Sequence, residues 1–190
     1  KGRFGGSIEV YDKETKDLIW DYAVSTNIYP YGWMTANVGD MSNKGIELSL
    51  NAVPVQTPDF SWTTTLNLSH NKNIVKAISK GDYSVDYIDQ GNPNIGGFAT
   101  ANVQRIMEGY PLGNFYTWEW AGYTADGRSQ YWEHDATTGE RLSTTTTDPQ
   151  DKDRAVTGYA QPALTLGWNN TLAYKGLSLN AFFQGNFGGK

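Results

Sequence analysis

Hydrophobic and polar residues alternate with a period of two in five stretches of the chain. The residues of the mainly apolar parity are, in order, Phe4, Ile8 and Val10; Ile46, Leu48, Leu50 and Ala52; Trp62, Thr64, Leu66 and Leu68; Leu164, Leu166, Trp168 and Leu172; and Leu177, Leu179, Ala181 and Phe183. Small polar residues such as Ser49, Asn67 and Thr165 take the other parity. Because successive side chains of a strand point to opposite faces, each stretch predicts a β-strand with one apolar face.

Two classes of protein carry this alternation. A soluble sandwich buries the apolar faces in its core, whereas a membrane barrel turns them to lipid and its polar faces to a wet lumen. The last four stretches are about ten residues long, which is enough to cross an outer membrane when the strands tilt by roughly 45°. The alternation alone is compatible with both classes.

The lengths of the connections favour the membrane barrel. Short turns join the second stretch to the third, at Pro54–Pro58, and the fourth to the fifth, at Tyr174–Gly176. The other connections, 25–36 and 72–160, are long and polar. Short turns at one end and long loops at the other are typical of outer-membrane barrels, and a compact soluble domain seldom holds so long an irregular stretch.

The 72–160 insert differs in character from the strands. It contains turn signals such as Asp126-Gly127 and Asp148-Pro149 among many aromatic residues. We expect a structured loop region with hairpins near 115–123 and 128–133, although an even number of further membrane strands is an alternative. The chain then forms one segment, 1–190, with barrel strands in 1–71, a mainly extracellular loop region in 72–160 and a barrel hairpin in 161–190.

Aromatic residues lie near the predicted strand ends, at Trp20, Tyr22, Trp62 and Tyr174. Barrels place such rings at both membrane interfaces, so these four predict aromatic girdles. Tyr and Trp are also good strand residues in any protein, which is the alternative explanation.

Composition and charge argue against several classes of function. A formal net charge of −5 without a Lys/Arg cluster argues against a nucleic-acid partner. The chain has no cysteine, and its two histidines, His70 and His134, are far apart, so we expect no metal site and no cofactor. No nucleophile elbow and no phosphate-binding loop is present, and carboxylate pairs such as Glu119 with Asp126 are close only in sequence. We expect no catalytic residue.

Several short motifs, in order and at fitting spacings, cover nearly the whole chain. The segment 37–47 reads N-V-G-D-M-S-N-K-G-I-E and resembles the N-x-G-x-x-x-N-K-G-x-E signature of SusC/RagA importers, which are TonB-dependent outer-membrane transporters. The segment 109–116 is similar to the G-x-P-x-G-x-F-Y motif of that family, and Asn71-Lys72-Asn73 is similar to its N-K-N motif. The residues that match the two longest motifs are Asn37, Gly39, Asn43, Lys44, Gly45, Glu47, Gly109, Pro111 and Gly113.

The resemblance implies an all-β fold, an antiparallel up-and-down transmembrane barrel of about 22 strands with long extracellular loops and a plug inside the lumen. It also implies a location in the bacterial outer membrane, in contact with lipid, and a SusD-like lipoprotein that covers the mouth. The cargo would be an oligosaccharide or a peptide, and energy would come through TonB. The chain supplies part of the barrel wall; the remainder of the barrel, the plug and the N-terminal TonB-binding part are expected outside it.

One family feature has no clear counterpart. The family often carries an acidic D-x-N-x-D-G segment, and the matching region here reads Asp135-Ala-Thr-Thr-Gly-Glu140, with Asp148, Asp151 and Asp153 later. Calcium needs several converging oxygen ligands, so we interpret these carboxylates as solvated loop acids.

The rival hypothesis is a soluble carbohydrate-binding β-domain. Its candidate sugar-stacking residues are Trp118, Trp120, Tyr131 and Trp132. In a transporter the same four rings would line the mouth and contact substrate, or would hold a long loop in one shape. Solubility separates the two classes, because a binding module buries its apolar strand faces and a barrel segment exposes them.

Overall fold

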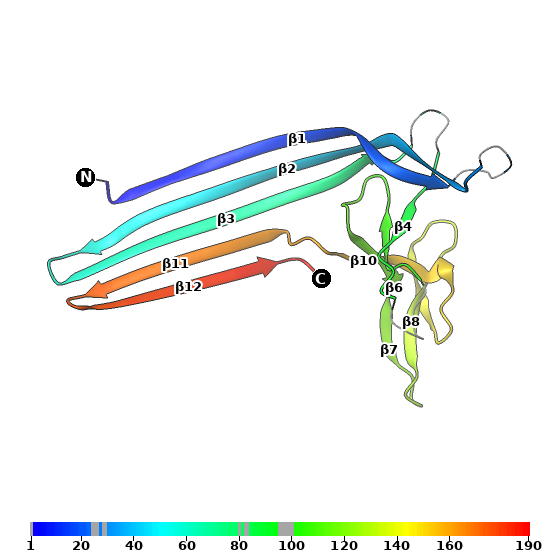
Figure 1. Ribbon diagram of the computed structural model, residues 1–190. Coiled ribbons are helices and arrows are strands. Elements are labelled where there is room, and N and C mark those ends of the chain that lie inside the picture. The colour runs from blue at the N-terminus through cyan, green and yellow to red at the C-terminus, as the bar shows by residue number, and fades with distance from the viewer. Residues whose placement is uncertain (1, 24–26, 28–29, 80, 82–83, 95–100) are drawn as a thin grey trace.

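The computed structural model describes residues 2–23, 27, 30–79, 81, 84–94 and 101–190. Its largest element is an antiparallel sheet with the order β1-β2-β3-β11-β12 (Figure 1). The strands are β1 (Phe4–Ala23), β2 (Trp33–Gln56), β3 (Phe60–Ala77), β11 (Leu164–Tyr174) and β12 (Leu177–Phe187). All five predicted strands are therefore present, and the all-β fold is confirmed.

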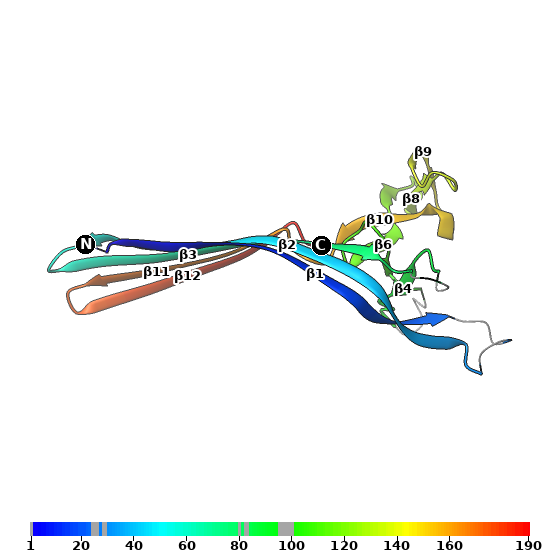
Figure 2. The ribbon, with the colours of Figure 1, turned by 90° about the horizontal axis from the view of Figure 1, so that it is seen from above.

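Strand register brings like side chains into rows across this sheet. Ile8 lies opposite Leu48, Leu48 opposite Leu68, and Leu68 opposite Leu166. The sheet viewed from above is a single thin layer, and no other element of the described chain covers its apolar face (Figure 2). Apolar side chains there are largely exposed, with Phe4 at 78% and Ile8 at 70%. This face is thus not the core of a sandwich.

The insert begins and ends at one end of the sheet. Although 86 residues separate Ala77 from Leu164, β3 pairs directly with β11. The described strands of the insert are three to six residues long, too short to cross a membrane, and lie in two further sheets (Figure 1). One has the order β10-β6-β5-β4 and the other β7-β8-β9; their bounds are β4 (Ile88–Gln90), β5 (Gln104–Ile106), β6 (Asn114–Trp118), β7 (Trp120–Tyr123), β8 (Ser129–His134), β9 (Arg141–Thr146) and β10 (Arg154–Tyr159).

Neither predicted hairpin of the insert forms within its predicted residues. The 128–133 stretch forms β8, which pairs with β7 on one side and β9 on the other. A hairpin at 115–123 is wrong, because β6 and β7 belong to different sheets. β6 takes β10 as its partner, with Trp118 opposite Arg154, and β7 continues into β8 through the 124–128 turn, where Thr124 N–H donates to Arg128 O.

The buried core lies where the end of β3 meets the insert. Val75, Ile78 and Ile106 form it, and Trp20 and Leu112 pack against it. Tyr22 is only 2% exposed, and its hydroxyl donates to Ile78 O at 2.6 Å. Trp20 and Tyr22 were predicted as girdle residues, and that prediction is wrong because both rings turn toward this core. Trp62 and Tyr174 lie near the short turns, on the apolar face.

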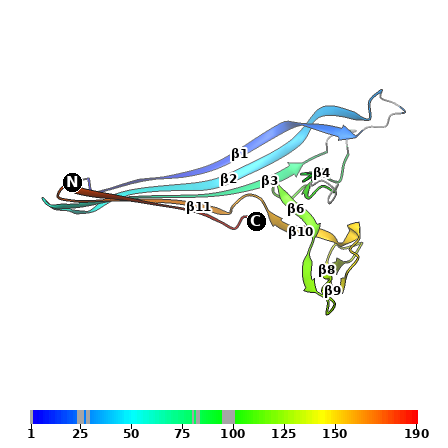
Figure 3. The same ribbon diagram turned by 60° about the horizontal axis from the view of Figure 1, so that its bottom comes forward.

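The hairpin of β1 and β2 extends past the end of β3 (Figure 3). Trp33 to Gly39 of β2 pair only with β1, and pairing with β3 starts at Asp40. The predicted 25–36 connection is thus shorter than expected, since β2 begins at Trp33; residues 24–26 and 28–29 lie outside the described part. The one helix among the described residues, the 3₁₀ helix η1 (Asp151–Asp153), is far too short to cross a membrane.

Candidate functional site

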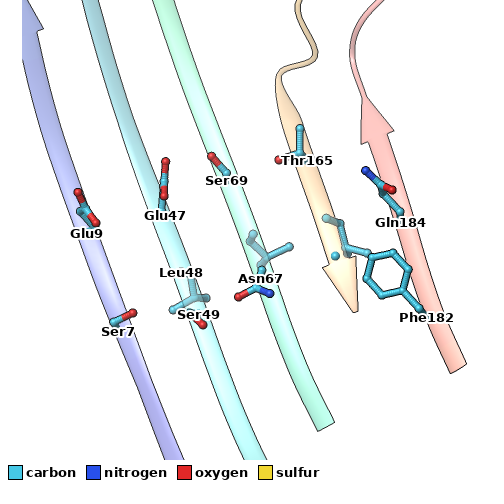
Figure 4. Close-up of a pocket in the computed structure, with 13 residues that line it drawn as sticks. Ser7, Glu9, Glu47, Leu48, Ser49, Asn67, Ser69, Thr165, Phe182 and Gln184 are labelled. Atoms are coloured by element: carbon cyan, nitrogen blue, oxygen red, sulfur yellow. The ribbon is translucent and has the colours of Figure 1, made fainter. Parts of the chain in front are cut away.

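The polar face of the large sheet carries a shallow depression of about 360 Å³ (Figure 4). Two rows of side chains that are neighbours across the strands line it. The rows are Ser7, Ser49, Asn67, Gly167 and Gln184, and Glu9, Glu47, Ser69 and Thr165. Hydroxyls, amides and carboxylates can donate to or accept from the hydroxyl groups of a sugar or the backbone of a peptide.

Two carboxylates stand opposite each other in this depression. Glu9 and Glu47 are register partners on β1 and β2, and both are exposed. Figure 4 shows the two carboxylates side by side on the same face. Like charges placed directly opposite each other destabilise a sheet, so this pair favours a cation nearby. Glu47 ends the 37–47 motif.

The N-K motifs of two strands run antiparallel and face each other. Asn43 lies opposite Asn73, Lys44 opposite Lys72 and Gly45 opposite Asn71. Asn73 is 5% exposed. Its Nδ2 donates to Asn43 Oδ1 at 2.8 Å, and its Oδ1 accepts the backbone N–H of Leu112 at 2.8 Å. Asn73 thus ties both strands to the insert.

The 109–113 motif lies against the same end of β3. Gly109 N–H donates to Val75 O, and Val75 N–H donates to Tyr110 O, both at 2.9 Å. Gly109 and Gly113 both have φ +83, a conformation that residues with a Cβ rarely adopt. Pro111 stands between them and fixes the φ of the tight segment. Three predicted motifs, far apart in sequence, therefore meet at one hydrogen-bonded junction.

Aromatic rings pack directly against the two glycines of the 37–47 motif. A Cβ at Gly39 would overlap the indole of Trp20, and a Cβ at Gly45 would overlap the ring of Tyr11 and lie 2.7 Å from His70 O. The motif is glycine at both positions because a ring occupies the space of the missing side chain. Asn37 is exposed, opposite Ile19, and takes no part in the junction.

The four predicted substrate-binding aromatics divide into two groups. Trp118 and Tyr131 contact edge to face, with ring centroids 6.3 Å apart, and Trp120 lies opposite Tyr131 in the β7–β8 register. Trp118 is 40% and Trp120 56% exposed. Trp132 follows Tyr131 and so belongs to the other face of β8, where the guanidinium of Arg141 lies 5.0 Å from its ring.

The acidic residues of the insert serve the loops themselves. Asp135 Oδ1 accepts the N–H groups of Thr137 and Thr138, which forms a local turn. Asp153 is 1% exposed, so its interpretation as a solvated acid is wrong. Its burial alone would raise the pKa of its carboxyl, but the N–H groups of Gln150 and His134 and the Lys152 ammonium outweigh that effect and lower the pKa. Within the described residues, no three His, Cys, Asp or Glu side chains converge as metal ligands.

Known proteins similar to this chain are TonB-dependent receptors. No family model matches the sequence. TonB-dependent receptor P3 of Formosa agariphila is 31% identical over 97% of this chain, and receptor P26 of the same organism is 32% identical over 98%. TonB-dependent receptor SusC of Bacteroides thetaiotaomicron is 33% identical over 62% of the chain.

Solved structures show the same fold. The RagAB peptide importer superposes over 98% of the chain with a TM-score of 0.77 in its open-open state and 0.75 in its closed-closed state, at 23% identity. This chain belongs to the SusC/RagA-type TonB-dependent receptors. It spans 18% of the length of receptor P3 and 19% of that of P26. These relatives are receptors and transporters, not enzymes.

A SusC/RagA-type receptor is an outer-membrane protein, and this location explains the exposed apolar face. From Phe60, which pairs with Tyr174 near the short turns, to His70, β3 covers eleven residues, or about 25 Å of height for strands tilted by roughly 45°. That height matches the apolar band of an outer-membrane barrel. The soluble carbohydrate-binding module explains neither this uncovered face nor the matches to receptors.

The outward face of this receptor segment also satisfies its own polar groups. Trp62 Nε1 donates to Asn170 Oδ1 at 3.1 Å, and Trp168 Nε1 donates to Thr64 Oγ1 at 2.9 Å. Lipid supplies no hydrogen-bond partner, so polar side chains there need partners within the protein. Each of the two indole N–H groups therefore has an acceptor on the adjacent strand.

Replacing Asn73 with alanine should loosen the junction between the barrel strands and the insert. The change leaves Asn43 Oδ1 and the N–H of Leu112 without their buried partner, which costs about 1–3 kcal/mol for each unsatisfied group. Hydrogen exchange of the whole receptor should be faster in 109–113. Alanine at the exposed Asn67 of the same strand is the control, and equal exchange in the two variants would contradict the assigned role of Asn73.

Proposed function

We propose that the receptor carrying this chain imports oligosaccharides or peptides across the outer membrane. The observation that carries the proposal is the five-stranded sheet with a lipid-facing apolar side, a hydrogen-bonding polar side and a structured insert at one end. The names of similar proteins support it, since one is SusC and another is the RagAB peptide importer. In this proposal the short turns lie at the periplasmic end and the insert is extracellular.

We propose separate roles for the polar face of the sheet and for the insert. The polar face with Glu9 and Glu47 would line the lumen, where cationic groups of the plug would compensate the two carboxylates. The 72–160 region would lie at the mouth, beneath a SusD-like lipoprotein. Energy would reach the plug through TonB.

Substrate contact is proposed for the exposed ring face of the insert. Trp118, Trp120 and Tyr131 offer apolar faces of the kind that stack on sugar rings or on apolar side chains of a peptide. Trp132 lies beneath Arg141 on the other face, which assigns it to packing. The proposal therefore keeps three of the four predicted residues as contact residues.

Alanine at both Trp118 and Trp120 should reduce uptake by roughly ten- to a hundredfold at limiting substrate, since each lost stacking contact is worth about 0.5–1.5 kcal/mol. Uptake of labelled oligosaccharides and of peptides would be measured in cells that depend on the receptor. Leu142→Ala, at a residue 40% exposed on β9, is the control. Unchanged uptake of both cargo classes, with the receptor present in the membrane, would contradict this assignment.

A further inference from the structure

The two lysines of the N-K motifs are direct neighbours at the outer end of the apolar face. Lys44 on β2 and Lys72 on β3 are register partners, and both are exposed. They share a parity with the apolar residues Ile46 and Leu48 and with Leu68. Both side chains therefore start from the lipid-facing side of the sheet. The motif asparagines Asn43 and Asn73, one position away, belong to the opposite face.

The position of Lys44 and Lys72 along the membrane normal determines what surrounds their side chains. Lys72 is two residues beyond His70, where the apolar band ends, and the band is about 25 Å tall. Lysines at such a boundary extend along apolar surface and place their ammonium groups among lipid headgroups. The pair is thus continuous with the lipid interface already described. On the proposed orientation, with the insert outside the cell, these headgroups belong to the outer leaflet.

Charge at this boundary is only partly balanced. Lys44 Nζ is 2.6 Å from Asp12 Oδ2, its register partner on β1. Among the ion pairs of the described residues none involves Lys72. Two lysines directly opposite each other repel, and the two carboxylates that compensate the pair, Asp12 and Glu14, both act on Lys44. An anion at headgroup height would balance the second.

We propose that Lys72, with Lys44, binds the phosphate group of an outer-leaflet lipid. An ammonium group carries three donors on a flexible stem and takes phosphate as a point charge, without demanding a fixed planar geometry. Asp12 on β1 lies on the side of Lys44 away from Lys72 on β3, so Lys72 is the ammonium left for the phosphate and Lys44 adds a second positive charge beside it. The site lies on the outer wall of the barrel and would anchor the receptor in its lipid, separately from substrate. Its orientation rests on the proposed function.

The test uses the whole purified receptor in detergent, titrated with bis-phosphorylated lipid A and, in parallel, with the same lipid after enzymatic removal of its phosphates. Binding would be read by native mass spectrometry. We expect the wild type to prefer the phosphorylated lipid. The Kd should rise roughly fivefold for each lysine removed, in Lys72→Gln and in Lys44→Gln/Lys72→Gln. Added salt should weaken wild-type binding more than binding by the double variant.

A matched control comes from the same height of the wall. Lys13 lies opposite Asn43 and so belongs to the inward face, and Lys13→Gln should leave lipid binding unchanged. Lys44→Arg/Lys72→Arg keeps both charges and should keep the preference, which gives a readout even if the glutamine variant does not fold. Equal affinity of the wild type for the two lipids, or an equal loss in Lys13→Gln, overturns the proposal.

The lipid measurement does not involve import. Failure of uptake in cells would count against the proposed function and leave the lipid result readable. Loss of the phosphate preference would count against the lipid site alone. Inorganic phosphate at the same concentration should not displace the lipid; displacement would show a free-anion site and would also overturn the proposal.

Discussion

Replacing Arg105 with alanine is expected to destabilise the β10-β6-β5-β4 sheet by about 3 kcal/mol, the lower end of the cost of breaking a buried ion pair, because the Asp89 left unpaired is 28% exposed. The Arg105 side chain is 8% exposed, and its Nε and Nη2 donate to the two carboxylate oxygens of Asp89 at 2.7 and 3.0 Å. Its guanidinium also lies between two rings, 3.6 Å from the centroid of Tyr87 and 4.0 Å from that of Tyr116. Alanine removes the charge pair and both ring contacts together.

The measurement is limited proteolysis and hydrogen exchange of the insert in the whole receptor. Lysine at position 105 keeps the charge but loses the two-pronged hydrogen bond and the stacking, so it should restore only part of the protection. Arg128→Ala is the matched control, because Arg128 pairs with Asp126 at 2.9 Å while both side chains are more than half exposed, and such pairs contribute about 0–1 kcal/mol. Equal protection of the insert in Arg105→Ala and Arg128→Ala would contradict the prediction.

Replacing Gly45 with alanine is expected to strain the barrel wall and to cost about 1–3 kcal/mol, as overpacking does. The new Cβ would overlap the Tyr11 ring and lie 2.7 Å from the carbonyl oxygen of His70. The carbonyl belongs to the backbone of β3 and cannot turn away as a flexible side chain would. Thermal unfolding of the purified receptor in detergent would show the loss as a lower midpoint temperature.

Two further variants isolate the cause. Gly5→Ala should be nearly neutral, because a Cβ there meets no atom within 4 Å and the glycine lies in the same sheet. Tyr11→Ala combined with Gly45→Ala should recover part of the lost stability, since it removes one of the two overlaps and leaves the carbonyl contact. Additive losses in the double variant would show that Tyr11 is not the neighbour that excludes a side chain at position 45.

Strands and their faces could be predicted from the sequence because their signal is local. Alternation at Ile46–Ala52 or Leu164–Leu172 reports directly which residues share an apolar face, and the connection lengths and motifs then assign that face to lipid. The short turns at Pro54–Pro58 and Tyr174–Gly176 likewise follow from neighbouring residues. The structure of the insert was harder to predict from the sequence. The hairpin expected at 115–123 does not form because β6 pairs with β10.

Candidate site residues were located by motif, but their roles depended on strand pairing. The letters N-K-G and N-K-N do not reveal that Lys44 and Lys72 meet on the outer face while Asn43 and Asn73 meet on the inner one. The prediction that Trp20 and Tyr22 belong to an aromatic girdle was wrong because the position of each ring also depends on tertiary contacts. A ring at a strand end can turn to lipid or to a core, and the insert supplied a core around Ile78.

The sequence by itself therefore determined the five long strands and the polarity of each face, since a period of two is written in adjacent residues, and its short motifs indicated the class of the protein. Only the tertiary structure decided that β3 pairs with β11 across the insert, that Asn73 holds Leu112, and that Trp118 and Trp120 both lie beside Tyr131. These features depend on register between residues that are distant in sequence. Register is fixed when all the strands pair together, and no single stretch of the chain contains it.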